Sequence, residues 1–273
     1  MVQQDRVIEL LSEHYGEFLD RRNIEIGFPG GFLNFGDWTG IPLKSRLTLE
    51  QRVDSQRAMY RSVLKLLGVK PSDVVLEIAS GRGSGCVLAL EEYNPAKIFG
   101  IDVMPIQVER AKKFNSDALD TYPNRLNYQV GSGMNIPYAD NYFDKVFSVE
   151  AFLYFSDLNR CLSEICRVMR RPARLSVACV FATSSAVPSD DWLHLFDRSG
   201  VATGFAISDI ISKLNDFGFT DVSSESIGRN VWFGYREWVA QNFDIEHPMP
   251  ERWYQGYRAG LFDYYILSAT LSS

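Results

Sequence analysis

The residues with the clearest capacity for chemistry lie between Val74 and Gly85. An apolar run there reaches an acid, Glu77, and a glycine-dense turn with Gly81 and Gly83 follows it. Glycine lets a backbone approach a ligand without interference from a side chain. The free N–H groups in the first turn of the next helix would face the same place. The alternative interpretation is an ordinary strand–helix turn whose glycines are incidental.

The spacing of these glycines excludes two classes of ligand site. A triphosphate-binding loop ends in Gly-Lys-Ser/Thr, whereas this one ends in Gly-Ser-Gly-Cys. A dinucleotide site needs a third glycine where this chain has Cys86 or, in the other register, Leu88. The remaining pattern is acid-x-x-x-Gly-x-Gly, with Asp102 one strand–helix–strand unit later. An acid there can bind both hydroxyls of a ribose, and an uncharged turn can accept an amino-acid group.

Strands that alternate with helices position these residues. Apolar runs predict seven strands, and helical periodicity or capping signals predict helices near 3–20, from Thr48 and Gln51 to Leu67, after Pro105, and at 157–169 and 208–217. This alternation is typical of an α/β fold with a mainly parallel sheet covered on both faces. The predicted strands are 74–78, 97–101, 126–130, 143–149, 175–181, 220–227 and 262–269.

Three segments rich in aromatic residues do not follow the strand–helix pattern. The first, near 27–40, is glycine-rich and includes Phe28, Phe32, Phe35 and Trp38. The other two, 182–206 with Trp192 and 230–260 with Trp232, are predicted to be irregular insertions. Exposed aromatics at this density would favour aggregation, so they must cover either the domain core or a ligand. We expect one domain over 1–273, with N-terminal helices and a lid at 1–68, a cofactor-binding core at 69–181, and a substrate cap formed by the two insertions.

Composition narrows the class of protein. The chain has 273 residues, a net charge of -6, and hydrophobic and charged contents of 46% and 23%, which are typical of a globular protein. The charge argues against nucleic-acid binding. We see no export signal, no apolar run long enough to span a membrane, and no metal-like spacing among the four cysteines, so we predict no metal and a cytoplasmic location. The expected partner is a small-molecule substrate. The sequence leaves open a homodimer, in which a second copy of the chain would be a further partner.

Four motifs, in order, resemble class I S-adenosylmethionine-dependent methyltransferases of the small-molecule (natural-product and ubiquinone-type) branch. They are Glu77-Ile-Ala-Ser-Gly-Arg-Gly, Phe99-Gly-Ile-Asp-Val, the segment from Val130 to Glu150, and Leu162-Ser-Glu-Ile-Cys-Arg-Val-Met. The resemblance covers roughly residues 60–185. It implies a Rossmann-like, doubly wound seven-stranded sheet whose last strand is antiparallel. It also implies S-adenosylmethionine as the cofactor.

The resemblance also implies which residues meet that cofactor. Gly81 and Gly83 would line its methionine part, Asp102 would bind the ribose, and the segments after Asp102 and around Gly133 would flank the adenine. The full set implied is Glu77, Ala79, Gly81, Gly83, Asp102, Val103, Met104, Gln107, Ser132, Gly133, Met134 and Glu150.

The chain departs from the family pattern at several positions. Ala79 replaces the first loop glycine, Ser132 replaces an acid that often meets the adenine amino group, and Tyr154 replaces a histidine four residues after Glu150. These departures leave two hypotheses open. The first is methyl transfer to oxygen, nitrogen or carbon of a small, largely apolar metabolite. The second is a methyltransferase-like cyclase or isomerase that keeps the cofactor without transferring the methyl group.

Methyl transfer from a sulfonium is an in-line displacement, in which positioning supplies much of the acceleration. A base is needed only when the proton of the acceptor must leave early. The candidates for this role are His194, Tyr154 and Glu150. His194 could equally be an exposed histidine of the cap, and Tyr154 could simply pack. The candidate substrate-binding residues are aromatic: Phe28, Phe32, Phe35, Trp38, Tyr154, Trp192 and Trp232.

Overall fold

The computed structural model describes residues 28–195, 204–242 and 249–272; the helix predicted near 3–20 lies outside them. Its centre is a seven-stranded sheet with the order β3-β2-β1-β4-β5-β7-β6. Every neighbouring pair is parallel except those made by β7, so the last strand alone runs antiparallel, as the family resemblance implied. The strands are β1 (Val74–Ile78), β2 (Lys97–Asp102), β3 (Leu126–Val130), β4 (Phe143–Val149), β5 (Met169–Ala182), β6 (Phe219–Ser226) and β7 (Phe262–Leu271).

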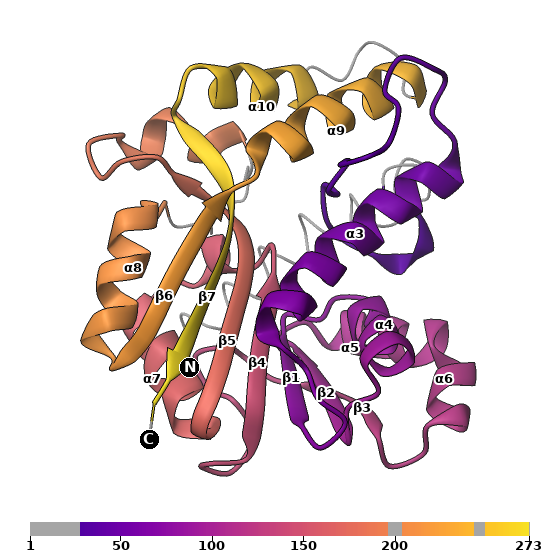
Figure 1. The fold of residues 1–273 in the computed structure, drawn as a ribbon, viewed down its shortest axis with the longest axis vertical. Coiled ribbons are helices and arrows are strands. Elements are labelled where there is room, and N and C mark those ends of the chain that lie inside the picture. Colours follow the sequence, from indigo (N-terminus) through magenta and orange to yellow (C-terminus); the bar gives the residue numbers. More distant parts are fainter. Residues whose placement is uncertain (1–27, 196–203, 243–248, 273) are drawn as a thin grey trace.

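Helices cover both faces of this sheet (Figure 1). Successive strand residues point to opposite faces, so Val75 joins one buried cluster while Leu76 joins the other. The first cluster includes side chains of α3 (Leu49–Leu67), α4 (Ser84–Tyr93) and α5 (Pro105–Phe114), the last of which is followed by the short α6 (Ser116–Thr121). The second includes α7 (Leu158–Val168) and α8 (Ile207–Asp216). The doubly wound architecture predicted from the alternating pattern is therefore confirmed.

Local sequence signals set the ends of several helices. Thr48 and Gln51 form a reciprocal capping box at the start of α3, and Gly68 ends it in a left-handed conformation at φ 65°. Pro105 opens α5, where its missing N–H costs nothing. These predictions from sequence are confirmed at the residues named.

The segment 230–260 was wrongly predicted to be irregular. It contains two helices, α9 (Gly228–Asn242) and α10 (Met249–Arg258). The buried positions Val231, Tyr235, Trp238 and Val239 recur at helical spacing, but Trp232 and Phe233, which directly follow Val231, obscured that period in the sequence. Strand β5 also starts earlier than predicted, at Met169 instead of 175.

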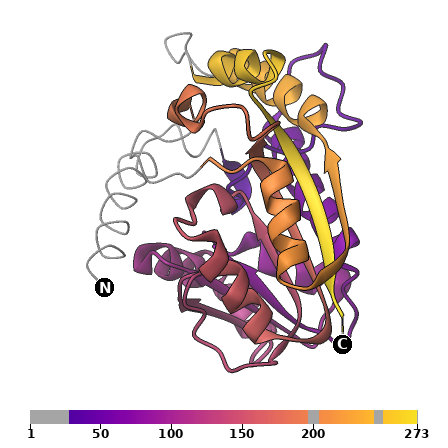
Figure 2. The same cartoon turned by 90° about the vertical axis from the view of Figure 1, so that its left-hand side faces the viewer.

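Helices α9 and α10 lie at the end of the sheet where the parallel strands terminate (Figures 1 and 2). Strand β7 starts there, since Phe262 pairs with Ala182, the last residue of β5. The segment after β5 forms two short 3-10 helices, η3 (Ser189–Asp191) and η4 (Leu193–Leu195). Trp192 between them packs on Phe262 at 5.7 Å between ring centroids. These parts together cover the carboxyl ends of the strands.

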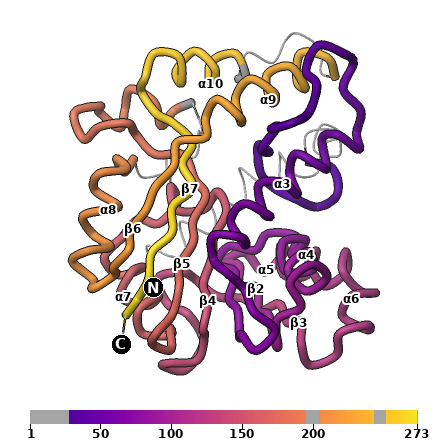
Figure 3. Tube along the Cα trace, in the orientation of Figure 1, coloured from indigo at the N-terminus to yellow at the C-terminus, as the bar shows by residue number. Residues whose placement is uncertain are grey.

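The segment from Phe28 to Leu47 is the third piece of this cover, and we call it the lid. It starts with the 3-10 turn η1 (Pro29–Gly31) and runs between α3 and α9 (Figure 3). The Asp37 N–H donates to the Ser55 carbonyl of α3 at 2.8 Å. The Trp38 N–H donates to the Asn230 carbonyl of α9 at 3.0 Å. Backbone hydrogen bonds therefore attach the lid to elements far apart in the sequence.

Within the described part of the chain, no helix is long and apolar enough to cross a membrane. The division into lid, core and cap regions given above stays a prediction, although the single sheet extends from residue 74 to 271.

The contact between the lid and α9 gives a test of the fold. A methyl group on Gly234 would overlap the Trp38 indole, so Gly234→Ala forces the lid and α9 apart. We expect the free energy of unfolding to fall by about 1–3 kcal/mol, although alanine is the better helix former. Urea unfolding checks this, and adding Trp38→Phe, which shrinks the ring, should recover part of the loss. A Gly234→Ala variant as stable as the wild type would contradict this packing.

Candidate functional site

The glycine loop between β1 and α4 adopts the backbone conformation that its sequence requires. Gly81 and Gly83 have φ of 52° and 76°, and Gly83 is the N-cap of α4. Below the loop, the Tyr128 hydroxyl of β3 donates to the Gly83 carbonyl at 2.7 Å, and a methyl group on Gly83 would overlap the same ring. Tyr128 therefore fixes the loop from inside the sheet, which leaves the other side of the backbone for a ligand.

Ala79 departs from the family pattern in residue type but not in conformation. Its φ of 59° is left-handed, which alanine adopts at a cost of roughly 1–2 kcal/mol relative to the right-handed region. The position thus keeps the turn that a glycine would make, at the expense of local strain. Ala79 also packs against the second core cluster.

Glu77 is completely buried beneath the loop. Its two carboxylate oxygens accept hydrogen bonds from the Tyr60 hydroxyl at 2.9 Å and from the Cys86 thiol at 3.0 Å. Burial, opposed by these hydrogen bonds, raises the pKa of Glu77 to about 7. Because both oxygens are held internally, Glu77 orders the start of α4. The resemblance includes Glu77 among the residues that meet the cofactor, and this arrangement favours ordering of the loop over direct contact with a ligand amino group.

Asp102, at the end of β2, is joined directly to the same loop. One oxygen accepts the Gly81 N–H and the other accepts the Met104 N–H, both at 2.9 Å. Burial raises the pKa of Asp102 to about 6, against the lowering effect of these two bonds. Each carboxylate oxygen has a second lone pair, so both can accept a further hydrogen bond.

Gln107 lies in the first turns of α5 and is 3% exposed. Within the described residues, its Oε1 is buried and accepts no hydrogen bond. A buried amide oxygen without a donor is costly, and such atoms in native proteins call for an explanation. A ligand hydroxyl or amine beside Asp102 would supply the missing donor.

The loop after β3 carries Ser132, Gly133 and Met134. The Ser132 hydroxyl accepts the Met134 N–H at 3.1 Å, which folds the loop back on itself. Gly133 is in close contact with Phe155, since an added methyl group would lie 2.9 Å from that ring. Val103 and Met134 are half-buried, so their apolar side chains remain partly accessible beside these loops.

Glu150 follows β4 and connects the sheet to the lid. Its Oε1 accepts the Phe35 N–H of the lid at 2.7 Å and the Tyr264 hydroxyl of β7 at 2.9 Å. Its backbone is left-handed at φ 58°. Burial is the main cause that raises the pKa of Glu150 to about 8, while its two donors and the charge of Arg52 lower it.

Arg52 of α3 holds the lid from the other side. Its guanidinium donates to the Asn34 carbonyl at 2.7 Å and to the Phe35 carbonyl at 3.1 Å, and it is fully buried. Aromatic rings surround it: the Arg52 Cζ atom lies 5.2–5.6 Å from the ring centroids of Tyr235, Trp38 and Phe28. Burial lowers the pKa of Arg52 only to about 10, so it remains a cation at neutral pH.

The aromatic residues predicted to bind substrate are packed in the cover itself. Phe35 is central, with ring centroids 5.1 Å from Trp232 and 5.0 Å from both Tyr235 and Trp253. The sequence left open whether these aromatic residues cover the domain core or a ligand. Most of their surface is buried by packing within the protein. Tyr154 is half-buried, and the other six are at most 9% exposed: Phe28, Phe32, Phe35, Trp38, Trp192 and Trp232.

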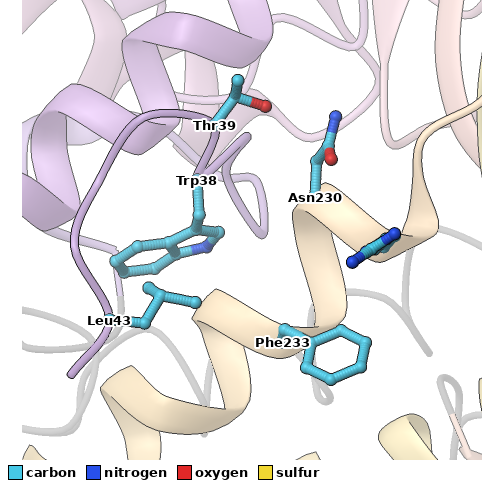
Figure 4. A pocket seen from close by; sticks show the side chains of 6 residues that line it. Trp38, Thr39, Leu43, Asn230 and Phe233 are labelled. Atoms are coloured by element: carbon cyan, nitrogen blue, oxygen red, sulfur yellow. The ribbon is translucent and has the colours of Figure 1, made fainter.

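Trp38 also borders a hollow on the α9 side of the lid (Figure 4). This pocket of about 320 Å³ is lined by Trp38, Thr39, Leu43, Arg229, Asn230 and Phe233. Its volume is at the lower end of the range for small-molecule sites.

The other two catalytic candidates lie in different surroundings. Tyr154 ends the 3-10 turn η2 (Phe152–Tyr154) after Glu150 and is half-buried. His194 is exposed in η4, and its Nδ1 is 3.0 Å from the Asp190 carbonyl oxygen. The contacts described for His194 do not connect it to Glu150 or to the glycine loop. No group of three or more His, Cys, Asp or Glu that could hold a metal ion occurs among the residues the structure describes.

Sequence reasoning missed the residues that hold the site in place. Tyr60, Tyr128 and Tyr264 were each assigned to an element without a role. Arg52 gave a usable signal, because it shares the core-facing stripe of α3 with apolar residues such as Met59 and Val63. A charged residue in a buried stripe is rare unless it is paired.

Comparison with known proteins assigns the central part of the chain to a domain family. Residues 76–177 match the methyltransferase domain family. This segment is a methyltransferase domain of the S-adenosylmethionine-dependent class I type. The family uses S-adenosylmethionine, and the match covers β1 to β5 of this methyltransferase fold, including Glu77, Asp102 and Glu150.

Curated relatives are distant and act on varied substrates. The methyltransferase is 27% identical over 213 residues to 24-methylenesterol C-methyltransferase 3 of Arabidopsis thaliana, covering 78% of this chain and 55% of that protein. It is 29% identical over 205 residues to the O-methyltransferase resE of Aspergillus sclerotiorum, covering 74% and 73%. The match thus spans about half the length of the sterol enzyme.

Solved structures share the fold. Geranyl diphosphate C-methyltransferase from Streptomyces coelicolor A3(2), determined with Mg2+, a substrate analogue and S-adenosyl-L-homocysteine, gives a TM-score of 0.82 at 14% identity, covering 97% of this chain and 98% of that one. The [4+2]-cyclase SpnF gives 0.73 at 17% identity, covering 96% and 94%. The fold is therefore common to methyltransferases and at least one cyclase.

A substitution at Gly83 tests the conformation of the loop. Gly83→Ala adds left-handed strain and overlaps Tyr128, so we expect the free energy of unfolding to fall by about 2–4 kcal/mol. Gly40→Ala is the matched control, because Gly40 has φ 80° and nothing within 4 Å of an added methyl group. It should lose only the strain, roughly 1–2 kcal/mol. Equal losses in urea unfolding would show that Tyr128 does not support the loop.

The buried Glu77 makes stability depend on pH. Its folded pKa of about 7 is above the ordinary 4.5, so its contribution is full below pH 4.5 and is lost as pH rises through 7. Glu77→Gln removes this loss. Between pH 5 and pH 8, we expect the variant to lose less unfolding free energy than the wild type, by on the order of 3 kcal/mol. Urea unfolding at both pH values measures this, with exposed Glu91→Gln as control; parallel pH dependence in all three proteins would refute the assignment.

Proposed function

We propose that this chain transfers the methyl group of S-adenosylmethionine to oxygen, nitrogen or carbon of a small, largely apolar metabolite of aromatic or polyketide-like character. The observation that carries this proposal is the pair formed by Asp102 and Gln107. Asp102 is buried at the end of β2 and accepts the Gly81 N–H of the glycine loop, and Gln107 is buried in the first turn of α5, which follows. Both have acceptor capacity that the described residues leave unused. A ribose offers two adjacent hydroxyl donors, which match these acceptors.

The residues present fit the rest of the cofactor. Gly81 and Gly83 would receive the amino-acid part, because glycine has no side chain of its own to keep a ligand from the backbone. Val103 and Met104 would pack on one face of the adenine. Ser132, Gly133 and Met134 would border its edge, where the Ser132 hydroxyl can still donate a hydrogen bond. Ala79 and Glu77 would act by holding the loop.

The bound cofactor supplies a methyl group on a sulfonium sulfur, and breaking that bond returns the electron pair to a neutral thioether. The chain's own task is then to position the acceptor in line and exclude water. Glu150 is the first candidate for a base, because its Oε2 has no hydrogen-bond partner among the described residues while Oε1 is held by two donors. Oε2 would take the proton that the acceptor loses. Tyr154 and His194 stay candidates for the same role.

The apolar character of the proposed acceptor rests on the cover. Phe35, Trp232 and Trp253 bring aromatic surface to the end of the sheet where Glu150 lies. Relatives are named for sterol, geranyl diphosphate and O-methyl transfer. These names support a small-molecule acceptor of this chemical kind. The cytoplasmic location and the homodimer expected from sequence stay predictions.

The alternative function, a cyclase or isomerase that retains the cofactor, is motivated by Ala79, Ser132 and Tyr154. Ala79 keeps the left-handed conformation that a glycine would adopt, so its departure from the family pattern gives little support to the alternative function. The two functions differ in products. Incubation with S-adenosylmethionine and a panel of phenols, amines and alkenes should give products heavier by one methyl group, together with S-adenosylhomocysteine, by mass spectrometry. Conversion without either change would favour the alternative.

A substitution at Gln107 separates binding from folding. Gln107→Met keeps the shape of the side chain and removes the buried amide oxygen that lacks a donor. We expect the ligand-free protein to gain about 1 kcal/mol of stability or remain unchanged, because an unsatisfied polar atom is lost. We expect S-adenosylmethionine to bind roughly 5- to 30-fold more weakly, since a hydrogen bond of about 1–2 kcal/mol is lost.

Calorimetry and thermal unfolding measure these two effects. The control is Asp120→Asn, because Asp120 is exposed on α6. It should change neither quantity. Undiminished affinity in Gln107→Met would remove Gln107 from the cofactor site, and loss of stability in the free protein would show that its amide is satisfied within the fold.

A further inference from the structure

The Glu150 carboxyl joins three parts of the chain at one atom. Oε1 receives the Phe35 N–H of the lid at 2.7 Å and the Tyr264 hydroxyl of β7 at 2.9 Å. Phe35 and Glu150 are separated by 115 positions in the sequence. The attachment of the lid to the sheet at this point therefore depends on how strongly one carboxyl oxygen accepts.

The Phe35 backbone is held on both sides, by the Glu150 carboxyl at its N–H and by the Arg52 cation at its carbonyl. Glu150 binds its N–H, and Arg52 binds its carbonyl at 3.1 Å and the preceding Asn34 carbonyl at 2.7 Å. Two residues before Phe35, Leu33 of the lid contacts Gly81. A methyl group added to Gly81 would lie 2.9 Å from the Leu33 side chain. The lid thus lies directly on the glycine loop to which the cofactor is assigned.

The groups that face Glu150 come from every element around it. They are Arg52 and Tyr60 of α3, Tyr235 of α9, Tyr264 of β7 and Cys179 of β5. Arg52 is the single cation in this set, and its described hydrogen bonds go to lid carbonyls and Ser55 instead of to Glu150. Burial raises the pKa of Glu150 to about 8, so at pH 7 the neutral acid predominates.

We propose that Glu150 responds to the positive charge of the bound cofactor and thereby tightens the attachment of the lid, with Tyr264 as a positioning residue. This inference rests on the proposed function, which assigns S-adenosylmethionine to the adjacent loop. A nearby cation favours the carboxylate over the acid. An ionised acceptor forms hydrogen bonds about twice as strong as a neutral one, so the bonds from Phe35 and Tyr264 strengthen together.

The same change reverses after the reaction. The thioether product carries no charge at sulfur, so the carboxylate loses the cation that stabilised it. If Glu150 has also accepted the proton of the acceptor at Oε2, it is already the neutral acid. Its hydrogen bond to the Phe35 N–H then weakens, which favours opening of the lid and release of both products. Ionisation of Glu150 therefore strengthens the attachment of the lid when the charged cofactor is bound, and loss of that charge weakens the attachment when the thioether product is bound.

The decisive measurement counts protons. At pH 7, binding of S-adenosylmethionine should release between about half a proton and one proton from Glu150, given its pKa of about 8. Binding of S-adenosylhomocysteine should release none from this group. Calorimetry in phosphate and in Tris buffer, which differ in ionisation enthalpy, gives the number released by each ligand. The difference between the two ligands is the quantity to compare, because it reduces the contribution of their shared amino group.

Glu150→Gln should abolish this difference. Glu225→Gln is the matched control, because Glu225 is an exposed carboxylate on β6, and it should keep the wild-type value. Hydrogen exchange of peptides spanning 28–38 gives a second readout. In the wild type, S-adenosylmethionine should slow this exchange at least about fivefold more than S-adenosylhomocysteine does, and Glu150→Gln should remove that preference.

Tyr264→Phe tests the positioning role and remains informative if Glu150→Gln does not fold. Loss of one donor to the carboxylate raises the pKa of Glu150 further, so proton release should persist about 1 to 2 pH units higher than in the wild type. A structural role alone would not move this profile. An unchanged profile, or equal proton release by both ligands in the wild type, overturns the inference. If S-adenosylmethionine does not bind at all, the proposed function itself fails, which is a distinct result.

Discussion

The constraint on which the rest of the site depends is the removal of three carboxylates from most of the solvent at the carboxyl edge of the sheet, two of them buried and Glu150 half-buried. Glu77, Asp102 and Glu150 stand at or next to the ends of β1, β2 and β4. A buried carboxylate is unstable unless donors surround it. The donors here come from other elements: a tyrosine of α3 and a thiol of α4 for Glu77, two loop N–H groups for Asp102, and the lid and β7 for Glu150. Satisfying these three groups fixes the glycine loop, the lid and the last strand relative to one another.

The sequence predicted the acids but not their partners. Strand ends and glycine spacing are local features, so Asp102 and the loop could be placed before the structure was known. Tyr60, Tyr128 and Tyr264 reach the site only after the sheet has formed, because each is far from its partner in the chain. A single tyrosine in an apolar strand or helix carries no mark that its hydroxyl is used. The order of the sheet and the antiparallel last strand were available through the family resemblance, not through the residues alone.

The aromatic segments show a different limit. Their density was evident, yet it is equally consistent with packing and with ligand binding, because both remove aromatic surface from water. The structure resolves most of that surface into contacts among Phe35, Trp232, Tyr235 and Trp253. The helical period of α9 was present but was masked because Trp232 and Phe233 directly follow Val231 and interrupt the apolar spacing. Arg52 was the clearer sign, since a guanidinium facing the core must have acceptors, and here they are the lid carbonyls.

The electrostatic state of the site follows from the same burial. The pKa values of Glu77, Asp102 and Glu150 are all raised, with desolvation as the largest cause in each, and the charge of Asp102 raises that of Glu77 further. A site with this many poorly solvated carboxyls favours a ligand that brings donors and positive charge. Hydroxyls suit Asp102, whose oxygens have unused lone pairs, and a cation suits Glu150, whose neighbour Arg52 is occupied elsewhere. A ligand that loses its charge during the reaction would then be held less tightly than one that enters, so the carboxyls that shape the fold would also favour release of the uncharged product.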